Sequence, residues 1–100
     1  METELSRGIE VVQSLSDCLM AIGNPTRFRI VEYCDQPRRF TEIVLNLKLN
    51  PASFKFHSGV LMDCKLIEKV ERGVYKRTAL GDLLLKLVEA ASKISIENCD

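Results

Sequence analysis

Hydrophobic residues recur every three or four positions over residues 4–22, a spacing typical of an amphipathic helix. The apolar positions there are Leu5, Ile9, Val12, Leu15, Leu19 and Ile22. The same spacing returns over residues 79–96, with Leu80, Leu83, Leu84, Leu87, Val88, Ala91 and Ile94. The pattern therefore predicts two long helices, one near each end of the chain.

Capping signals predict two shorter helices between these long ones. Asn24 and Asn50 each stand directly before a proline. Asparagine is a favoured N-cap, and proline suits the first helical position because its missing N–H would have no partner there anyway. These signals place helices over residues 25–34 and 51–64. The second of them presents an apolar face made of Phe54, Ser58, Leu61 and Met62.

A third short helix is expected between these two. Thr41 precedes it, and its apolar positions fall within residues 42–47. Leu49 and Asn50 then form the turn into the helix over residues 51–64. Two short helices joined by so few residues form a helix-turn-helix unit, here over residues 41–64.

The apolar period changes from 3.6 to 2 after the fourth helix, which indicates strands. Strands are predicted over residues 66–70 and 74–78, joined by Glu-Arg-Gly, in which Gly73 supplies a positive φ. This hairpin is a wing over residues 66–78, and residues 38–40 are a candidate extra strand. The expected fold is mainly α with a small β-hairpin wing, a winged helix-turn-helix of order α-α-α-α-β-β-α in one domain, residues 1–100.

The distribution of charge along the chain is more informative about function than the net charge. The 100 residues have a formal net charge of zero. Residues 37–78 nevertheless carry nine Lys or Arg against four Asp or Glu, a net of +5, and both flanks are acidic. A basic middle segment favours a nucleic-acid partner. No apolar stretch approaches the ~20 residues of a membrane helix, and the N-terminus is acidic, so we expect a cytoplasmic protein without a membrane partner.

Three segments of the chain carry recognisable motifs. Residues 21–30 read Ala-Ile-Gly-Asn-Pro-Thr-Arg-Phe-Arg-Ile, and residues 53–57 read Ser-Phe-Lys-Phe-His before Val-Leu and Leu-Ile pairs. Residues 75–78 read Tyr-Lys-Arg-Thr, with Gly81 behind them. Together these segments resemble the ArsR-like (arsenic-repressor-like) winged helix-turn-helix regulators, particularly their archaeal relatives. The resemblance implies a homodimer built from the helices at residues 4–22 and 79–96. It also implies repression of transcription through double-stranded DNA carrying a pseudo-palindromic operator.

The candidate DNA-binding residues lie on the predicted recognition helix, the wing and the short strand. They are Asn50, Ser53, Lys55, Phe56, His57, Arg72, Lys76, Arg38 and Arg39. Lysine and serine reach phosphates or base edges, and arginine at a hairpin tip suits a phosphate or the minor groove. The alternative for the helix is an ordinary solvent-facing start. Phe56 contacts either a thymine methyl group or the protein interior.

Two arginines in the second helix have two possible roles. Arg27 and Arg29 are further candidates for DNA, but one of them is equally suited to an ion pair with an acid such as Glu32.

The four cysteines argue against metal sensing. Cys18, Cys34, Cys64 and Cys99 contain no Cys-x-x-Cys pair, and His57 is the only histidine. We therefore expect no metal and no cofactor. The first three fall on apolar helix faces, where cysteine acts as a small hydrophobe. Cys99 follows the last helix, so an intersubunit disulfide or a redox-sensitive thiol is the hypothesis there.

Catalysis finds no support in the sequence. It offers no Ser/His/Asp set, no glycine-rich phosphate loop and no paired carboxylates in a plausible pocket, so we do not expect an enzyme. The alternative to a DNA-binding regulator is a winged-helix protein–protein interaction module without DNA binding. The zero net charge and Phe56 are the features that favour this alternative.

Overall fold

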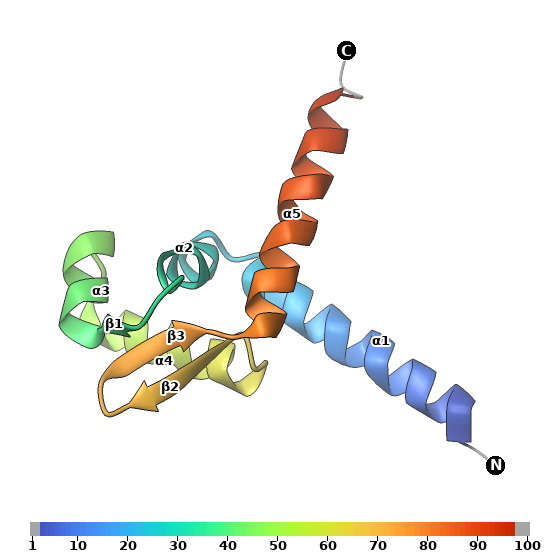
Figure 1. Cartoon of the computed structure of the whole chain (residues 1–100), viewed down its shortest axis with the longest axis horizontal. Helices are drawn as coiled ribbons and strands as arrows, with labels where there is room; N and C mark the ends of the chain where they lie inside the picture. The colour runs from blue at the N-terminus through green and yellow to red at the C-terminus, as the bar shows by residue number, and fades with distance from the viewer. Residues whose placement is uncertain (1–2, 98–100) are drawn as a thin grey trace.

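The computed structural model of this chain describes residues 3–97, and within them the side chains of residues 8, 10 and 13–94. Five helices and a three-stranded antiparallel sheet make up these residues (Figure 1). In chain order they are α1 (Thr3–Ile22), α2 (Pro25–Tyr33), β1 (Arg38–Arg39), α3 (Phe40–Leu47), α4 (Pro51–Asp63), β2 (Ile67–Glu71), β3 (Val74–Arg77) and α5 (Ala79–Glu97).

Both predicted asparagine caps are present. The Asn24 side-chain oxygen accepts hydrogen bonds from the backbone N–H groups of Thr26 and Arg27, at 2.9 and 3.1 Å. The Asn50 oxygen accepts one from Ala52 N–H at 2.8 Å. Caps of this kind stabilise a helix by about 1 kcal/mol each, because they satisfy N–H groups that lack a partner in the first turn.

The start of α3 differs from the prediction. The helix begins at Phe40, which we expected to be extended, and Arg39 is the N-cap. The reason is local: the Glu42 carboxylate accepts a hydrogen bond from the Arg39 backbone N–H at 3.1 Å, so Glu42 occupies the third helical position. At the other end Lys48 adopts a left-handed conformation with φ 56°, and this residue turns the chain toward α4.

The sheet has the strand order β1-β3-β2. The extra strand predicted before α3 exists, and it pairs Arg38 with Tyr75 and Arg39 with Val74. The hairpin between β2 and β3 turns at Arg72 and Gly73, and Gly73 has the expected positive φ of 72°. The sheet and the helix-turn-helix are joined where the Phe40 N–H donates to the Gly73 carbonyl at 2.8 Å.

Phe54 is the centre of the core beneath α4. It is 1% exposed, and its ring packs edge-on against Phe40 and Tyr75, with centroids 5.5 and 5.3 Å away. Aromatic pairs in this geometry add about 0.5–1.5 kcal/mol each beyond the area they bury. The wing and α4 are therefore held to each other by one aromatic cluster.

The C-terminal part of α4 is only partly interior. Leu61 is buried, as expected, and Ser58 is buried and donates to the Lys55 carbonyl at 3.2 Å. Val60 and Met62 are half-buried, and Asp63 is exposed. Of the face predicted for this helix, Phe54, Ser58 and Leu61 are therefore buried, and Met62 is only partly so.

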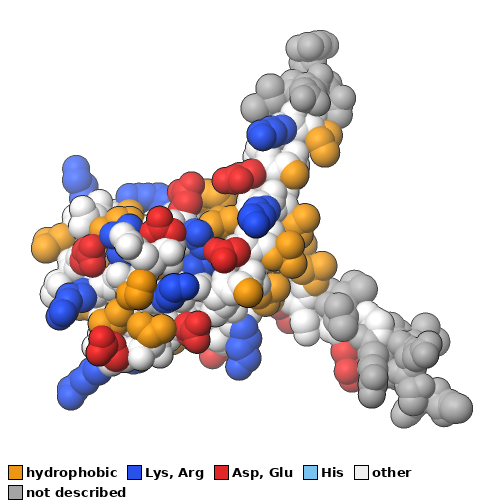
Figure 2. Space-filling model, viewed as in Figure 1, with side chains coloured by type: hydrophobic (Ala, Val, Ile, Leu, Met, Phe, Trp, Pro, Cys, Tyr) orange, Lys and Arg blue, Asp and Glu red, His pale blue; other side chains and the backbone are white. Residues whose placement is uncertain are grey.

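Helices α1 and α5 leave the body in different directions (Figure 1). The molecule measures 46 × 45 × 21 Å, with a radius of gyration of 15.3 Å against about 13 Å for a compact domain of 100 residues. Several large apolar side chains of these two helices remain exposed: Leu15, Leu19, Met20, Leu83, Leu87 and Ile94. Hydrophobic side chains gather along α5 and where it meets α1 (Figure 2).

Candidate nucleic-acid interface

The N-terminal half of α4 presents its polar side chains outward because Phe54 anchors the opposite face. Ser53 and Lys55, on either side of that anchor, are exposed. Phe56 is 64% exposed and touches the His57 ring edge-on at 5.3 Å. The sequence left two roles open for Phe56, a contact with a thymine methyl group or packing in the protein interior. Its exposure rules out the interior role.

His57 is tied to α2 through Arg27. The Arg27 guanidinium lies 3.3 Å from Nδ1 of His57 and also donates to the Ala21 carbonyl at 2.7 Å. Arginine is always a donor, so Nδ1 accepts and the proton of the neutral ring sits on Nε2. Burial, and then the Arg27 charge, lowers the pKa of His57. The ring is therefore held neutral, with one N–H donor available.

A cleft of about 490 Å³ separates the start of α4 from the hairpin. Its floor is aromatic, with Phe40, Phe54 and Tyr75. Three cationic residues, Lys55, Lys69 and Arg72, also line it. Together with the partial positive charge of the α4 N-terminus, they make this cleft cationic, and we call it the cationic cleft.

Lys69 was absent from the predicted set. It lies on β2 opposite Tyr75, and its Nζ is 5.6 Å from the centre of the Tyr75 ring. The alternation of the two strands could have indicated that Lys69 lies on the same face as Tyr75, because residues paired across two strands share one face. Recognising it required the register of the hairpin, which sequence alone did not fix.

Lys76 lies outside the cleft. Its neighbour Tyr75 points toward Phe54, and successive side chains of a strand alternate between faces, so Lys76 points the other way. Its partner across the ladder is Glu68. Arg39 is exposed at the edge strand β1.

Arg38 is engaged within the chain. Its guanidinium forms ion pairs with Asp35 at 2.9 Å and Glu42 at 3.3 Å, donates to the Tyr33 carbonyl and stacks 4.3 Å over the Tyr33 ring. These contacts raise the pKa of Arg38 against the effect of burial. These four contacts, to Tyr33, Asp35 and Glu42, brace α2 against α3. The sequence had instead suggested Arg38 as a candidate for DNA binding.

An ion pair between Glu32 and either Arg27 or Arg29, the alternative that the sequence suggested, is not found among the described contacts. Arg29 donates instead to the Leu47 carbonyl at 3.1 Å, so it ties α2 to the end of α3. The Glu32 carbonyl, with that of Val31, accepts from Arg77, whose side chain also pairs with Asp82.

The cysteines behave as small hydrophobes in the described part of the chain. Cys18 and Cys34 are buried and Cys64 is half-buried. Burial raises the pKa of Cys34 to about 12. Within the described residues no three His, Cys, Asp or Glu side chains converge as metal ligands would. Cys99 lies outside the described residues.

Helix-turn-helix, aromatic cluster and cationic hairpin together define a winged helix-turn-helix domain. The chain is similar to the homodimeric winged helix-turn-helix DNA-binding domain Mb0332 from Mycobacterium bovis, described as a possible ArsR-family transcriptional regulator. The TM-score is 0.80 at 19% identity, over 97% of this chain and 94% of that one. It is also similar to RHA00566, an ArsR family transcriptional regulator, with a TM-score of 0.63 at 17% identity, over 88% and 95%.

These likenesses establish the fold, and neither neighbour is described as archaeal, so the archaeal part of the resemblance gains no support. No protein-family model and no curated protein matches the sequence. None of the described helices is long and apolar enough to cross a membrane.

Proposed function

We propose that this protein is a homodimeric, sequence-specific DNA-binding transcriptional regulator that acts as a cytoplasmic repressor. The observation that carries the proposal is the cationic cleft, in which α4 and the hairpin present Lys55, Lys69 and Arg72 together. The two structural neighbours are described as transcriptional regulators, and one as a homodimeric DNA-binding domain, which supports the same reading.

The first two turns of α4 enter the major groove in this proposal. Ser53, Lys55 and Phe56 are exposed there and suit phosphate, guanine and thymine-methyl contacts respectively. His57 donates from Nε2, because Arg27 occupies Nδ1. The Asn50 oxygen is used in capping, so its amide NH₂ is the group left for a phosphate.

The hairpin supplies contacts to the DNA backbone. Arg72 at its tip and Lys69 on β2 approach phosphates from the cleft side. Lys76 and Arg39 lie outside the cleft, so we assign them peripheral phosphate contacts. Arg38 then acts as a positioning residue that fixes β1 and α3 under the interface.

Dimerisation uses the exposed apolar faces of α1 and α5. Leu83 and Leu87 are each about half exposed, and Leu19 of α1 is 42% exposed. A second copy of the chain would cover these side chains and remove them from water. Two recognition helices related by a two-fold axis read two half-sites about one helical turn apart, which explains a pseudo-palindromic operator.

A protein–protein module remains the second candidate because some apolar side chains are exposed outside α1 and α5. Phe56 on α4, Leu45 on α3 and Val70 on β2 are 64%, 76% and 46% exposed. In that case Phe56 is an anchor for a protein partner, and the cations are a solvated rim.

Fluorescence polarisation with labelled duplexes selected from a random pool separates these candidates. We expect Lys55→Ala and Arg72→Ala each to weaken binding about five- to tenfold, since a phosphate or base contact is worth roughly 1 kcal/mol or more. Lys86→Ala is the matched control, because Lys86 is an exposed cation on α5. If the pool yields no bound duplex, or if all three variants weaken binding equally, the DNA proposal is wrong.

A further inference from the structure

Two cysteines outside the cationic cleft lie side by side where α1 meets the end of α4. The Cys18 thiol donates to the Cys64 carbonyl at 3.4 Å, and the Cys64 thiol lies 4.0 Å from the carbonyl of Asp17. The two residues are 46 positions apart in the chain. Each thiol therefore contacts the backbone at or next to the other cysteine, which places the two side chains beside each other.

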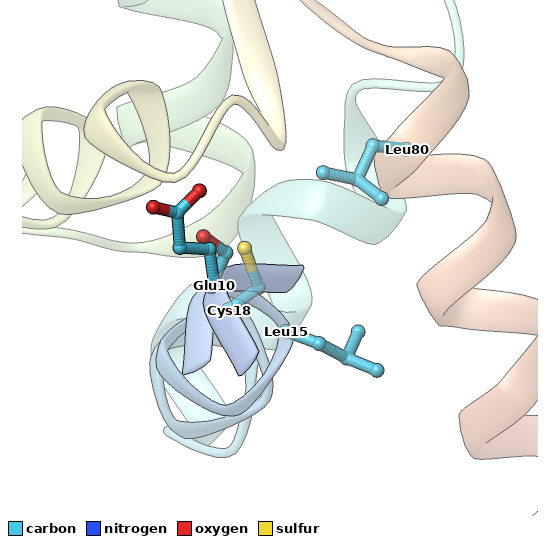
Figure 3. A pocket seen from close by; sticks show the side chains of 5 residues that line it. Glu10, Leu15, Cys18 and Leu80 are labelled. Carbon is cyan, nitrogen blue, oxygen red and sulfur yellow. The ribbon is translucent and has the colours of Figure 1, made fainter. Parts of the chain in front are cut away.

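Small molecules have access to Cys18 from a neighbouring cleft. A cleft of about 400 Å³ is lined by Glu10, Ser14, Leu15, Cys18 and Leu80. Figure 3 shows the Cys18 sulfur pointing into this space, with Glu10 and Leu15 on α1 and Leu80 on α5. Cys64 is itself half-buried, so it is the more exposed thiol of the two.

Cys64 lies at the very end of α4. It is the C-cap, one residue beyond the last helical position, and Lys65 behind it turns the chain with φ 63°. A small shift of Cys64 toward α1 therefore acts on the last turn of α4, where the Cys64 N–H donates to the Val60 carbonyl at 3.1 Å. Cys34 offers the contrast, because it is 0% exposed.

We propose that Cys18 and Cys64 are a reversible disulfide site, oxidised by hydroperoxides and reduced by dithiols. The Cys64 thiolate attacks the peroxide, the O–O bond breaks, and sulfenic acid and one water result in the case of hydrogen peroxide. The Cys18 thiolate then attacks the sulfenic sulfur, the S–O bond breaks, and a second water leaves. Two thiols have lost two electrons and two protons, and the peroxide has become two waters.

The second step has a pH signature. Burial, and then the neighbouring Cys64 thiol, raises the pKa of Cys18 in the reduced protein, and the contribution of burial persists once Cys64 is a sulfenic acid. Only the thiolate attacks, so disulfide closure is slow at neutral pH and accelerates as the pH rises toward that pKa.

The bond would join the end of the recognition helix to the proposed dimerisation helix. Resting on the proposed function, we infer that oxidation lowers DNA affinity, because moving α4 relative to α1 changes the separation of the two recognition helices in a dimer.

Peptide mapping by mass spectrometry tests the site directly. The full chain carrying Cys99→Ser is treated with hydrogen peroxide, alkylated and digested without reductant. We expect a peptide cross-linked through Cys18 and Cys64, its loss on adding dithiothreitol, and Cys34 recovered as the alkylated thiol. Cys64→Ser in the same background should yield no cross-link, whereas Cys34→Ala should leave it intact. Cross-links through other pairs, or over-oxidation of Cys64 without a cross-link, would overturn the proposal.

A polarisation titration of the oxidised and reduced forms tests the regulatory part. We expect oxidation to weaken DNA binding at least threefold, dithiothreitol to restore it, and Cys64→Ser to be insensitive to peroxide. Equal affinity of both forms would overturn the regulatory role. Absence of DNA binding in either form would instead contradict the proposed function and leave the disulfide site to the mapping.

Discussion

The cationic cleft and the apolar faces of α1 and α5 are both exposed, but they are built differently. The cleft carries its charges over a closed aromatic cluster, with Phe54 1% exposed beneath Lys55 and the hairpin. The outer faces of α1 and α5 have the reverse composition, because leucines such as Leu83 and Leu87 are left half exposed. Cationic side chains held over a rigid aromatic cluster are suited to binding a polyanion. Exposed leucine side chains are suited to packing against another apolar surface.

The largest effect is expected from removing the base of the cleft. Phe54→Ala should lower the free energy of unfolding by about 3–5 kcal/mol, because it removes a buried ring and leaves a cavity among Phe40 and Tyr75. Urea denaturation measures this. Phe56→Ala is the matched control, since that ring is 64% exposed and its loss should cost less than about 0.5 kcal/mol. Similar losses in both variants would mean that the two phenylalanines do not differ in burial as described.

The next effect concerns the apolar face. Leu83→Glu combined with Leu87→Glu should raise the dimer dissociation constant at least about 100-fold, because charge in a leucine interface costs several kcal/mol, at roughly 1.4 kcal/mol per tenfold. Analytical ultracentrifugation reports the mass. Leu45→Glu, on α3 and 76% exposed, should leave the mass unchanged. A wild-type protein that is monomeric throughout would refute the dimer face altogether.

Smaller changes in stability are expected from alanine substitutions at two glycines, one in α5 and one in α4. A Cβ at Gly81 would overlap the Leu66 carbonyl oxygen and lie 2.7 Å from Cγ of Arg77, so Gly81→Ala should destabilise the chain by about 1–3 kcal/mol. Gly59 in α4 has open space around it, and Gly59→Ala should stabilise by about 0.5–1 kcal/mol. Thermal unfolding gives both signs, and a stable Gly81→Ala variant would show that α5 does not pack this closely on the wing.

The smallest effect is the pH dependence of His57. Its folded pKa is lowered by burial and by Arg27, below the unfolded value of about 6.5. The unfolded chain therefore takes up a proton first, so this contribution to stability is complete above that value and is lost as the pH falls below it. Urea midpoints between pH 8 and pH 5 should fall less in His57→Gln than in wild type. Parallel profiles would mean that folding does not lower the pKa of His57.

Local signals predicted the fold well. Asn24 and Asn50 cap the helices they were expected to start, and Gly73 turns the hairpin. These features depend on a few neighbouring residues, which a sequence displays directly. The start of α3 was misplaced because Glu42 reaches back to the Arg39 N–H, an exchange that no apolar pattern records.

The candidate site was predicted less completely, because it depends on contacts between distant segments. Lys69 joins the cleft through its register with Tyr75, and Arg27 reaches His57 across 30 positions. Arg38 looked free in sequence, yet Asp35 and Glu42 occupy it. Charge identifies candidates, but only the fold decides which cations face outward.

The salt dependence of DNA affinity tests the central claim most directly. Polarisation titrations are made at salt concentrations from about 50 to about 200 mM. The logarithm of the DNA association constant should fall linearly with the logarithm of the salt concentration. We predict that Lys55→Ala and Arg72→Ala each reduce the slope by about 1, while Lys86→Ala leaves it unchanged. A slope of zero in wild type, or equal slopes in all four proteins, would contradict the assignment of the cationic cleft to DNA.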